Sequence, residues 1–337
     1  MPKVREASHA GSWYTDDGRQ LQRQLDKWLD QVPSSIRPIG TMSSQEGEFS
    51  PPVPNARAII APHAGYAYSG PAAAWAYKSA DWANVKRVFL LGPSHHHYLP
   101  TAATTACEKY ETPLGDLIVD VDLVQKIKKE WNLDTMNLKT DEDEHSLEMH
   151  LPYIHRMLSL QNTSFQQNPA SVPLIPIMVG ATTPKTERDL GARLAPYLTD
   201  PSNIFVISSD FCHWGSRFSY TYYQPRSGAT TAVQLRSSTS SSDLKDYPIH
   251  ASIKAVDFES MDAIESGVHD EFVRQLERTG NTVCGRHPIG VFMAAVESAG
   301  LLGEGKGRFR FVRYERSSEV VSVKDSSVSY ASAFAVL

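Results

Sequence analysis

The sequence predicts a single α/β domain, a three-layer α/β/α sandwich around a central sheet that is largely parallel or mixed. Short apolar runs, typical of strands buried on both faces, recur at 57–61, 88–91, 174–179 and 203–208. Segments with the helical spacing of apolar residues separate these runs, and this alternation builds parallel sheets. The pattern continues without a linker, so we expect one domain over residues 1–337.

The N-terminal region predicts one amphipathic helix followed by a flexible insertion. Leu21, Leu25 and Leu29 share one helix face, and the capping candidate Asp17 stands just before them. Residues 33–55 are rich in Pro, Ser, Gly and Glu, and such a composition buries too little apolar surface to offset the entropy of ordering the chain. We expect a flexible surface insertion there, because a core strand follows directly.

Two strands joined by a helix follow and form the centre of the predicted sheet. The run at 57–61 leads to a helix expected over 71–80, with Pro71 tolerated in its first turn, and then to the run at 88–91. Strand, helix and strand in this order form a βαβ unit. Because parallel strands end at the same edge of a sheet, residues that directly follow the two strands should lie close together.

The rest of the chain continues the alternation of strands and helices. We expect short strands within 101–120, helices near 121–131 and from Leu147, a strand at 174–179, a helix at 184–198, a strand at 203–208, helices within 257–279 and after Gly290, and two closing strands near the C-terminus. The serine-rich residues 216–250 are expected to form loops.

Composition and charge exclude several classes of protein. With 41% hydrophobic and 21% charged residues, the chain has the composition of a globular protein, and no apolar run is long enough to span a membrane. A net charge of −5 without a basic stripe argues against nucleic acid or an anionic membrane as the main partner. The three cysteines and the lack of a signal-peptide pattern predict reduced thiols and a location in the cytosol or nucleus.

Histidines follow the buried strands at the points where these strands end. His63 comes after the first run, His95 and His96 come after the second, and His213 follows the run at 203–208. Imidazole suits iron, copper and zinc, and ligands of open α/β sheets gather beyond the carboxyl ends of the strands. We therefore predict that His63 and His95 approach one shared ion. A solvated polar loop is the alternative for each histidine alone.

Further side chains are candidates for the same site. Two histidines and one anionic ligand leave positions open for O₂ or a small molecule, as in non-haem iron sites. Cys284 lies beside Arg286 and His287 at a predicted helix start, where cations lower the pKa of a thiol; a buried structural thiol is the alternative. The candidate ligands are His63, His95, His96, His145, His213, Cys284, Asp210 and Glu148.

Other polar residues are candidates for roles beside the metal. Asp210 and His213 are candidates for an acid–base pair, and a turn stabilised by their polar groups is the alternative. His145 stands at a predicted helix start, where capping is its structural explanation. His9 can also reach the site, since Gly11 permits a close approach of the backbone.

Six segments together resemble the Memo family, the mediators of ErbB-driven cell motility. They are REASHAGSWY, APHAGYAYSG, GPSHHH, TDEDEHSLEMHLPY, SSDFCHWG and CGRHPIG, and they are spread over nearly the whole chain. The family is similar to class III extradiol dioxygenases, which hold non-haem iron on an α/β/α fold. The resemblance implies His63, His95 and Cys284 as metal ligands, with the cysteine where those dioxygenases have a glutamate. It also implies His213 at the position of their catalytic base and His145 as a further histidine of the cleft.

The resemblance implies iron (Fe²⁺), or else copper, as the cofactor, and a redox role in cytoskeletal signalling. The expected catalytic residues are His213, His145 and Asp210, and the expected ligand-binding residues are Arg286, His96 and Trp13. Two alternatives stay open. One is a metal-free module that binds phosphotyrosine or acidic peptides in the same cleft, with Arg286 supplying charge-assisted hydrogen bonds. The other is a ring-cleaving dioxygenase, which the oxidisable thiolate disfavours. The sequence leaves the oligomeric state open.

Overall fold

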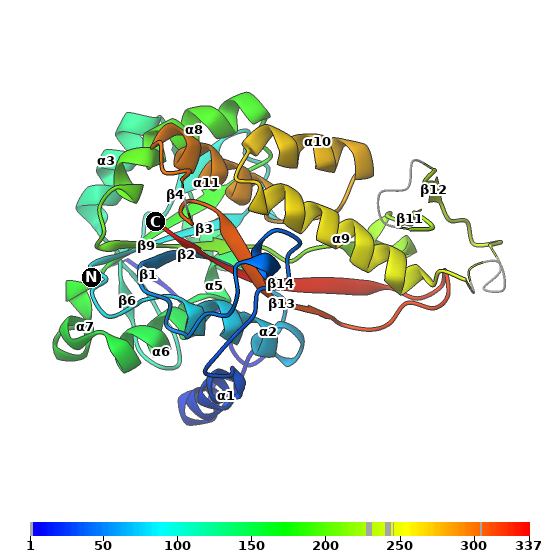
Figure 1. Cartoon of the computed structure of the whole chain (residues 1–337). Coiled ribbons are helices and arrows are strands. Elements are labelled where there is room, and N and C mark those ends of the chain that lie inside the picture. The colour runs from blue at the N-terminus through cyan, green and yellow to red at the C-terminus, as the bar shows by residue number, and fades with distance from the viewer. Residues whose placement is uncertain (1–2, 227–230, 240–243, 245, 304) are drawn as a thin grey trace.

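A large mixed β-sheet with helices on both faces forms the centre of the computed structural model (Figure 1). The structure describes residues 3–226, 231–239, 244, 246–303 and 305–337. The strand order in the sheet is β10-β14-β2-β9-β3-β8-β4-β7, and β13 pairs with β14. This arrangement confirms the predicted α/β fold.

The central strands of the sheet are parallel. They are β2 (Ala56–Ala61), β9 (Asn203–Ser208), β3 (Arg87–Pro93) and β8 (Leu174–Val179). On either side of them an antiparallel strand follows, which makes the sheet mixed. The strands outside the parallel centre are β14 (Ser327–Val336), β13 (Phe309–Arg316), β10 (His213–Trp214), β4 (Ala102–Thr104) and β7 (Asp134–Thr135).

Two small sheets lie beside the main one. The first joins β1 (Val4–Arg5), β5 (Lys109–Tyr110) and β6 (Leu117–Ile118). The second pairs β11 (Tyr222–Tyr223) with β12 (Val233–Gln234). The second sheet and the short helix η3 (Ser216–Phe218) lie within the segment predicted as loops, whose serines at 240–242 fall outside the described residues.

Helices cover both faces of the sheet (Figure 1). On one face lie α3 (Val121–Trp131), α8 (Pro184–Leu198), α9 (Ile249–Glu265), α10 (His269–Thr279) and α11 (Arg286–Ser298). On the other lie α1 (Gly18–Gln31), α2 (Tyr66–Ser79), α6 (Leu151–Gln161) and α7 (Thr163–Gln167), and the single-turn α4 (Leu138–Asp143) and α5 (His145–Glu148) precede α6. None of the described helices combines the length and the apolar character needed to cross a bilayer.

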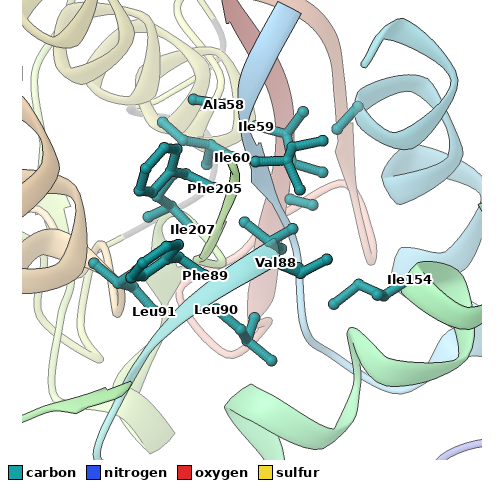
Figure 2. Packing of buried hydrophobic residues seen from close by; sticks show 14 of the residues in the cluster. Ala58, Ile59, Ile60, Val88, Phe89, Leu90, Leu91, Ile154, Phe205 and Ile207 are labelled. Atoms are coloured by element: carbon teal, nitrogen blue, oxygen red, sulfur yellow. The ribbon is translucent and has the colours of Figure 1, made fainter. Parts of the chain in front are cut away.

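The core lies between the parallel strands and these helices (Figure 2). Every residue of β2, β8 and β9 is buried, as expected for strands covered on both faces. Phe89 stacks on Phe205 of the neighbouring strand with ring centroids 5.1 Å apart. Full burial of such a side chain stabilises the fold by roughly 1.5–3 kcal/mol relative to leaving it in water. The core therefore fixes the strand ends from which the site is built.

Helix α2 begins earlier than the sequence pattern predicts. It starts at Tyr66 with Gly65 as its N-cap, so Pro71 lies inside the helix and not in its first turn. The Tyr66 ring is buried, and its hydroxyl donates a hydrogen bond to the carbonyl of Met149. This anchoring of the first turn outweighs the preference of proline for the start of a helix.

Residues 33–55 pack against the core. Ile36 and Val53 are buried, and the Ser43 hydroxyl donates a 2.6 Å hydrogen bond to the buried carboxylate of Glu265. These contacts correct the expectation that this polar segment cannot bury enough surface to become ordered. Buried apolar residues and hydrogen bonds to the core therefore attach a segment whose average composition is polar.

Candidate metal centre

Three neighbouring parallel strands end at one place and deliver the polar residues of the candidate site. His63 follows β2, His95 follows β3, and Asp210 and His213 follow β9, which lies between the other two. The carboxyl ends of parallel strands are where open α/β sheets bind ligands. The predicted meeting of these residues at one edge of the sheet is confirmed.

A pocket of about 590 Å³ opens at this edge. Part of its lining comes from residues that the sequence singled out: Trp13, His63, His95, His145, Asp210 and His213. The wall also contains Arg217 and Phe218 from η3, and serines around the start of β14. The pocket therefore combines titratable groups, aromatic rings and hydroxyls.

His63, His95 and Cys284 form a group able to hold one metal ion. One ligand atom from each residue can be chosen so that all three lie within 4.8 Å of one another. The Cys284 sulfur is 3.2 Å from Nε2 of His63, and the two imidazole centroids are 5.1 Å apart. One ion could thus contact all three donors, and the predicted closeness of His63 and His95 is confirmed.

The hydrogen bonds of His63 fix its tautomer. The Ser208 hydroxyl donates its single proton to the Ser146 carbonyl at 2.7 Å, so Nδ1 of His63 must donate to Ser208 Oγ at 2.6 Å. Nε2 then carries a lone pair and faces Cys284. Burial and the neighbouring histidines hold the pKa of His63 well below 6.5, which keeps the ring neutral. The ring is therefore preset as a metal ligand.

Glu144 fixes the tautomer of His95 in a similar way. Its carboxylate accepts the His95 backbone N–H at 2.6 Å and Nδ1–H at 2.9 Å, which leaves Nε2 free. Burial alone would raise the pKa of Glu144, but the hydrogen bonds and the nearby imidazoles lower it to about 2. A carboxylate that holds the second nitrogen of a histidine is the usual outer support of a metal site.

The surroundings of Cys284 differ from the prediction. The side chain is half-buried, and burial together with the neighbouring Asp210 raises the pKa of the thiol well above its usual value. Arg286 is exposed at the start of α11, and His287 turns away to bind Glu187 at 2.7 Å. The expected lowering of the thiol pKa by these two cations is therefore wrong. A bound metal ion would have to displace the proton itself.

His145 lies between His95 and Trp13 in a stack of rings. Both neighbouring centroids are 4.4 Å from that of His145. Burial and the adjacent imidazoles lower the pKa of His145 to about 3, so this ring too is neutral. Within the described chain, Nδ1 of His145 is buried without a hydrogen-bond partner. This unpaired nitrogen, together with His95 and Glu144, forms a second group of metal-ligand type.

Asp210 and His213 take different positions around the pocket. Asp210 accepts the backbone N–H of His63 at 2.9 Å, and burial raises the pKa of its carboxyl. Nδ1 of His213 faces the carbonyls of Phe211 and Thr282 at 2.9 and 3.2 Å and so carries the proton. Nε2 of His213 is thus the basic nitrogen. Asp210 supports the loop of His63, and it has no hydrogen bond to the His213 ring.

Some predicted site residues lie elsewhere. Arg286 is absent from the lining of the pocket, and His96 is exposed, with its ring centroid 5.9 Å from that of His145. Glu148 is bound to Arg5 at 2.6 Å and to His9 at 2.9 Å, so it serves a buried ion cluster and is not a ligand of the metal group.

Sequence reasoning missed three residues that shape the site. Glu144 and Ser208 fix the two metal-facing histidines, and Arg217 supplies a cation to the pocket wall. Glu144 directly precedes His145 in a run of acids, where the local pattern indicates only a favourable charge at a helix start. Ser208 ends an otherwise apolar run, Ile204–Ile207, which is the one local signal for it.

The fold and the site define a class: an α/β protein with a His-His-Cys group at the ends of parallel strands. The family model described as Memo-like protein matches residues 5–334. The chain is 42% identical to protein MEMO1 of Homo sapiens and of Rattus norvegicus over 327 residues, which cover 97% of this chain and 95% of each relative. It is 39% identical to the memo-1 homolog of Caenorhabditis elegans over 329 residues, 98% of this chain and 81% of that protein. The chain belongs to the Memo family.

Proposed function

We propose that this protein is a redox-active metalloprotein that binds iron, or copper, through His63, His95 and Cys284. The observation that carries the proposal is the closeness of three donor atoms, one from each residue, which lie within 4.8 Å of one another. Both imidazoles hold their other nitrogen in a hydrogen bond that presets the free lone pair. The Memo resemblance adds cell-motility signalling in the cytosol or nucleus as the setting.

The donor set favours iron and copper. Two neutral imidazoles and one thiolate suit both metals, and a thiolate favours Cu(I) in particular. Three protein ligands leave open positions for O₂ or a small molecule. The sulfur ligand itself is a redox-sensitive element, because peroxide can oxidise a thiolate to sulfenic acid while the peroxide is reduced to water. Oxidation of Cys284 would then weaken metal binding.

The test is a competitive anaerobic titration with Fe(II) and Cu(I), preceded by elemental analysis of the purified protein. Cys284→Ser should weaken binding of both ions at least 100-fold, while the matched control Cys107→Ser, at a buried cysteine that is not part of the His63–His95–Cys284 group, leaves it unchanged. Cys284→Glu should keep Fe(II) and lose the preference for Cu(I). Equal binding of both ions by wild type and all three variants would remove Cys284 as a ligand and overturn the proposal.

A second candidate function is recognition of phosphotyrosine peptides in the same pocket. The observation in its favour is Arg217, whose guanidinium lies 4.7 Å from the centre of the Phe218 ring in the pocket wall. An arginine beside an aromatic ring suits an aryl phosphate, and Arg217 replaces Arg286 in this role. Binding of a phosphotyrosine peptide by metal-free protein, lost in Arg217→Ala and kept in Arg286→Ala, would support it. Binding that needs the metal, or that survives Arg217→Ala, would contradict it.

A further inference from the structure

Strand β13 has a free edge with unpaired backbone groups. It pairs with β14 on one side, with Tyr314 opposite Ala331 and Arg316 opposite Ser329. The N–H of Ser317 donates to the carbonyl of β14 residue Val328, so the residues alternate and the backbone groups of Tyr314 and Arg316 point away from β14. In the described part of the chain, these outward N–H and C=O groups have no hydrogen-bond partner.

A few residues earlier along β13, another segment of the chain forms a backbone hydrogen bond with the same edge. The outward carbonyl of Phe311 accepts a 2.7 Å hydrogen bond from the N–H of Ile39, and the Phe311 N–H donates to Glu265 at 3.1 Å. An extended segment of the protein thus lies on the edge as far as Phe311. Beyond this point the edge continues without a partner strand.

A groove runs along this free edge. Two hollows of about 520 and 420 Å³ adjoin each other and share Lys254 and Tyr314 in their lining. The floor is β13, which lies between α2 and α9 (Figure 1). Trp75 of α2 stands on one side of the strand under Arg313, and Phe258 of α9 stands on the other against the ring of Tyr314.

The charges and rings of the groove suit an acidic strand. Cations line it at Arg37, Lys254, Arg313 and Arg316, against the acids Glu315 and Glu319, although the whole chain carries a net charge of −5. The ammonium of Lys254 lies 5.1 Å from the centre of the Phe258 ring, and the guanidinium of Arg313 lies 4.9 Å from that of Trp75.

We propose that this groove binds an extended acidic segment of a partner protein, which adds to β13 as a further strand. Backbone hydrogen bonds at Tyr314 and Arg316 would hold the segment, and its alternate side chains would face the two walls. Charged residues on an edge strand often serve to block such pairing. Here Arg313 lies over the Trp75 ring and binds Glu315 at 2.7 Å, and Lys254 of α9 lies over the Phe258 ring, so both cations are held along the walls of the groove. The proposal does not depend on the metal site.

The test uses a fluorescein-labelled peptide of alternating glutamate and valine and measures its binding by fluorescence anisotropy. Lys254→Glu should weaken binding at least tenfold, whereas the matched control Lys27→Glu, an exposed lysine of α1 outside the groove, changes it less than twofold. Amide hydrogen exchange should slow at Tyr314 and Arg316 when the peptide is bound.

Two further peptides separate strand addition from charge attraction alone. The same peptide with alternate backbone amides methylated keeps its charge but loses the donors for pairing, so it should not bind. A lysine–valine peptide should not bind either. Binding of the methylated peptide, or unchanged hydrogen exchange at β13, would overturn the proposal. So would self-association of the protein through this edge in sedimentation experiments, because the occupant would then be a second copy of the chain.

Discussion

Two clusters of histidines and carboxylates lie in this molecule, and their electrostatics are opposite. In the candidate metal centre, Glu144 holds His95, while His63 and His145 are neutral rings without a carboxylate of their own in direct hydrogen-bond contact. In the second cluster, Glu187 of α8 binds two histidines at once. Its oxygens lie 2.6 Å from His269 of α10 and 2.7 Å from His287 of α11.

The positions of the acids explain the difference. Burial lowers the pKa of His63 and His145, and the neighbouring imidazoles add to this effect. Burial also acts to lower the pKa of His269, but the hydrogen bond and charge of Glu187 outweigh it and raise that pKa. A neutral imidazole offers a lone pair to a metal, and an imidazolium does not. Clustered histidines thus form a neutral group with free lone pairs in one place and an ionic link between helices in the other.

The comparison predicts that the cluster of Glu187, His269 and His287 stabilises the folded protein. Glu187→Ala leaves the buried His269 and the half-buried His287 without their acceptor, and loss of one partner of a buried ion pair costs about 3 kcal/mol. Urea unfolding should show this loss, while Fe(II) affinity should stay within twofold of wild type. A large loss of metal affinity would mean that the two clusters are coupled through α11, which carries His287 and follows Cys284.

The candidate metal centre should respond mainly in its metal affinity. Glu144→Gln keeps an acceptor for His95 but removes the charge that supports the imidazole as a ligand, and changes of this kind cost about 10- to 100-fold in metal affinity. We expect that loss in a metal titration, together with a loss of about 1–3 kcal/mol of unfolding free energy, because the new amide nitrogen meets an N–H donor of His95 or Ser146. The control is Glu142→Gln, which makes the same change at a half-buried neighbour whose carboxylate accepts the Glu6 N–H at 3.0 Å. Equal effects of the two variants would contradict the role of Glu144.

The raised pKa of His269 predicts a pH dependence with a defined sign. Its ion pair with Glu187 is fully formed below about pH 6.5, the unfolded pKa of histidine, and is lost as pH rises through the higher folded pKa. Because the hydrogen bonds from the histidines hold the pKa of Glu187 below 4.5 despite burial, the stabilisation persists down to mildly acidic pH.

Wild type should therefore exceed Glu187→Gln in stability by more at pH 5.5 than at pH 9, with a difference of about 1 kcal/mol between the two conditions. Unfolding curves of both proteins at several pH values measure this, and the other titrating groups cancel in the comparison. If the difference in unfolding free energy between the two proteins does not change with pH, neutral hydrogen bonds hold the cluster together.

The sequence predicted the parallel centre of the fold and the meeting of the histidines for one physical reason. Strands buried on both faces are continuous apolar runs, and such runs at 174–179 and 203–208 match β8 and β9 in their bounds. Parallel strands bring the residues that follow them to one edge, so His63 and His95 could be paired from local signals alone. This pairing could be predicted without knowing the distance between the two residues.

The supports of the site could not be predicted in the same way. The bond between Glu144 and His95 joins residues far apart in the chain, and the turn of His287 toward Glu187 depends on how α8 packs on α11. Adjacency in the sequence placed Arg286 and His287 beside the Cys284 thiol, but the first turn of α11 directs them elsewhere. Side-chain direction on a helix follows from tertiary packing, which local spacing does not contain.

A third buried carboxylate, Glu265, gives the smallest expected effect and tests the segment at 33–55. Among the residues that the structure describes, no histidine or arginine binds it. It accepts hydrogen bonds from the Ser43 hydroxyl at 2.6 Å, the Ser43 N–H at 3.2 Å and the Phe311 N–H at 3.1 Å, and burial raises its pKa.

Ser43→Ala removes the shortest of these bonds and leaves the two backbone donors, so the protein should lose about 1 kcal/mol of unfolding free energy. The control Ser44→Ala alters a half-buried hydroxyl that donates to the Thr41 carbonyl and accepts from the Gln45 side chain at 3.4 Å, and it should change stability by less than about 0.5 kcal/mol. Equal stability of Ser43→Ala and wild type would mean that the hydrogen bond from Ser43 to Glu265 does not help to hold this segment on the core.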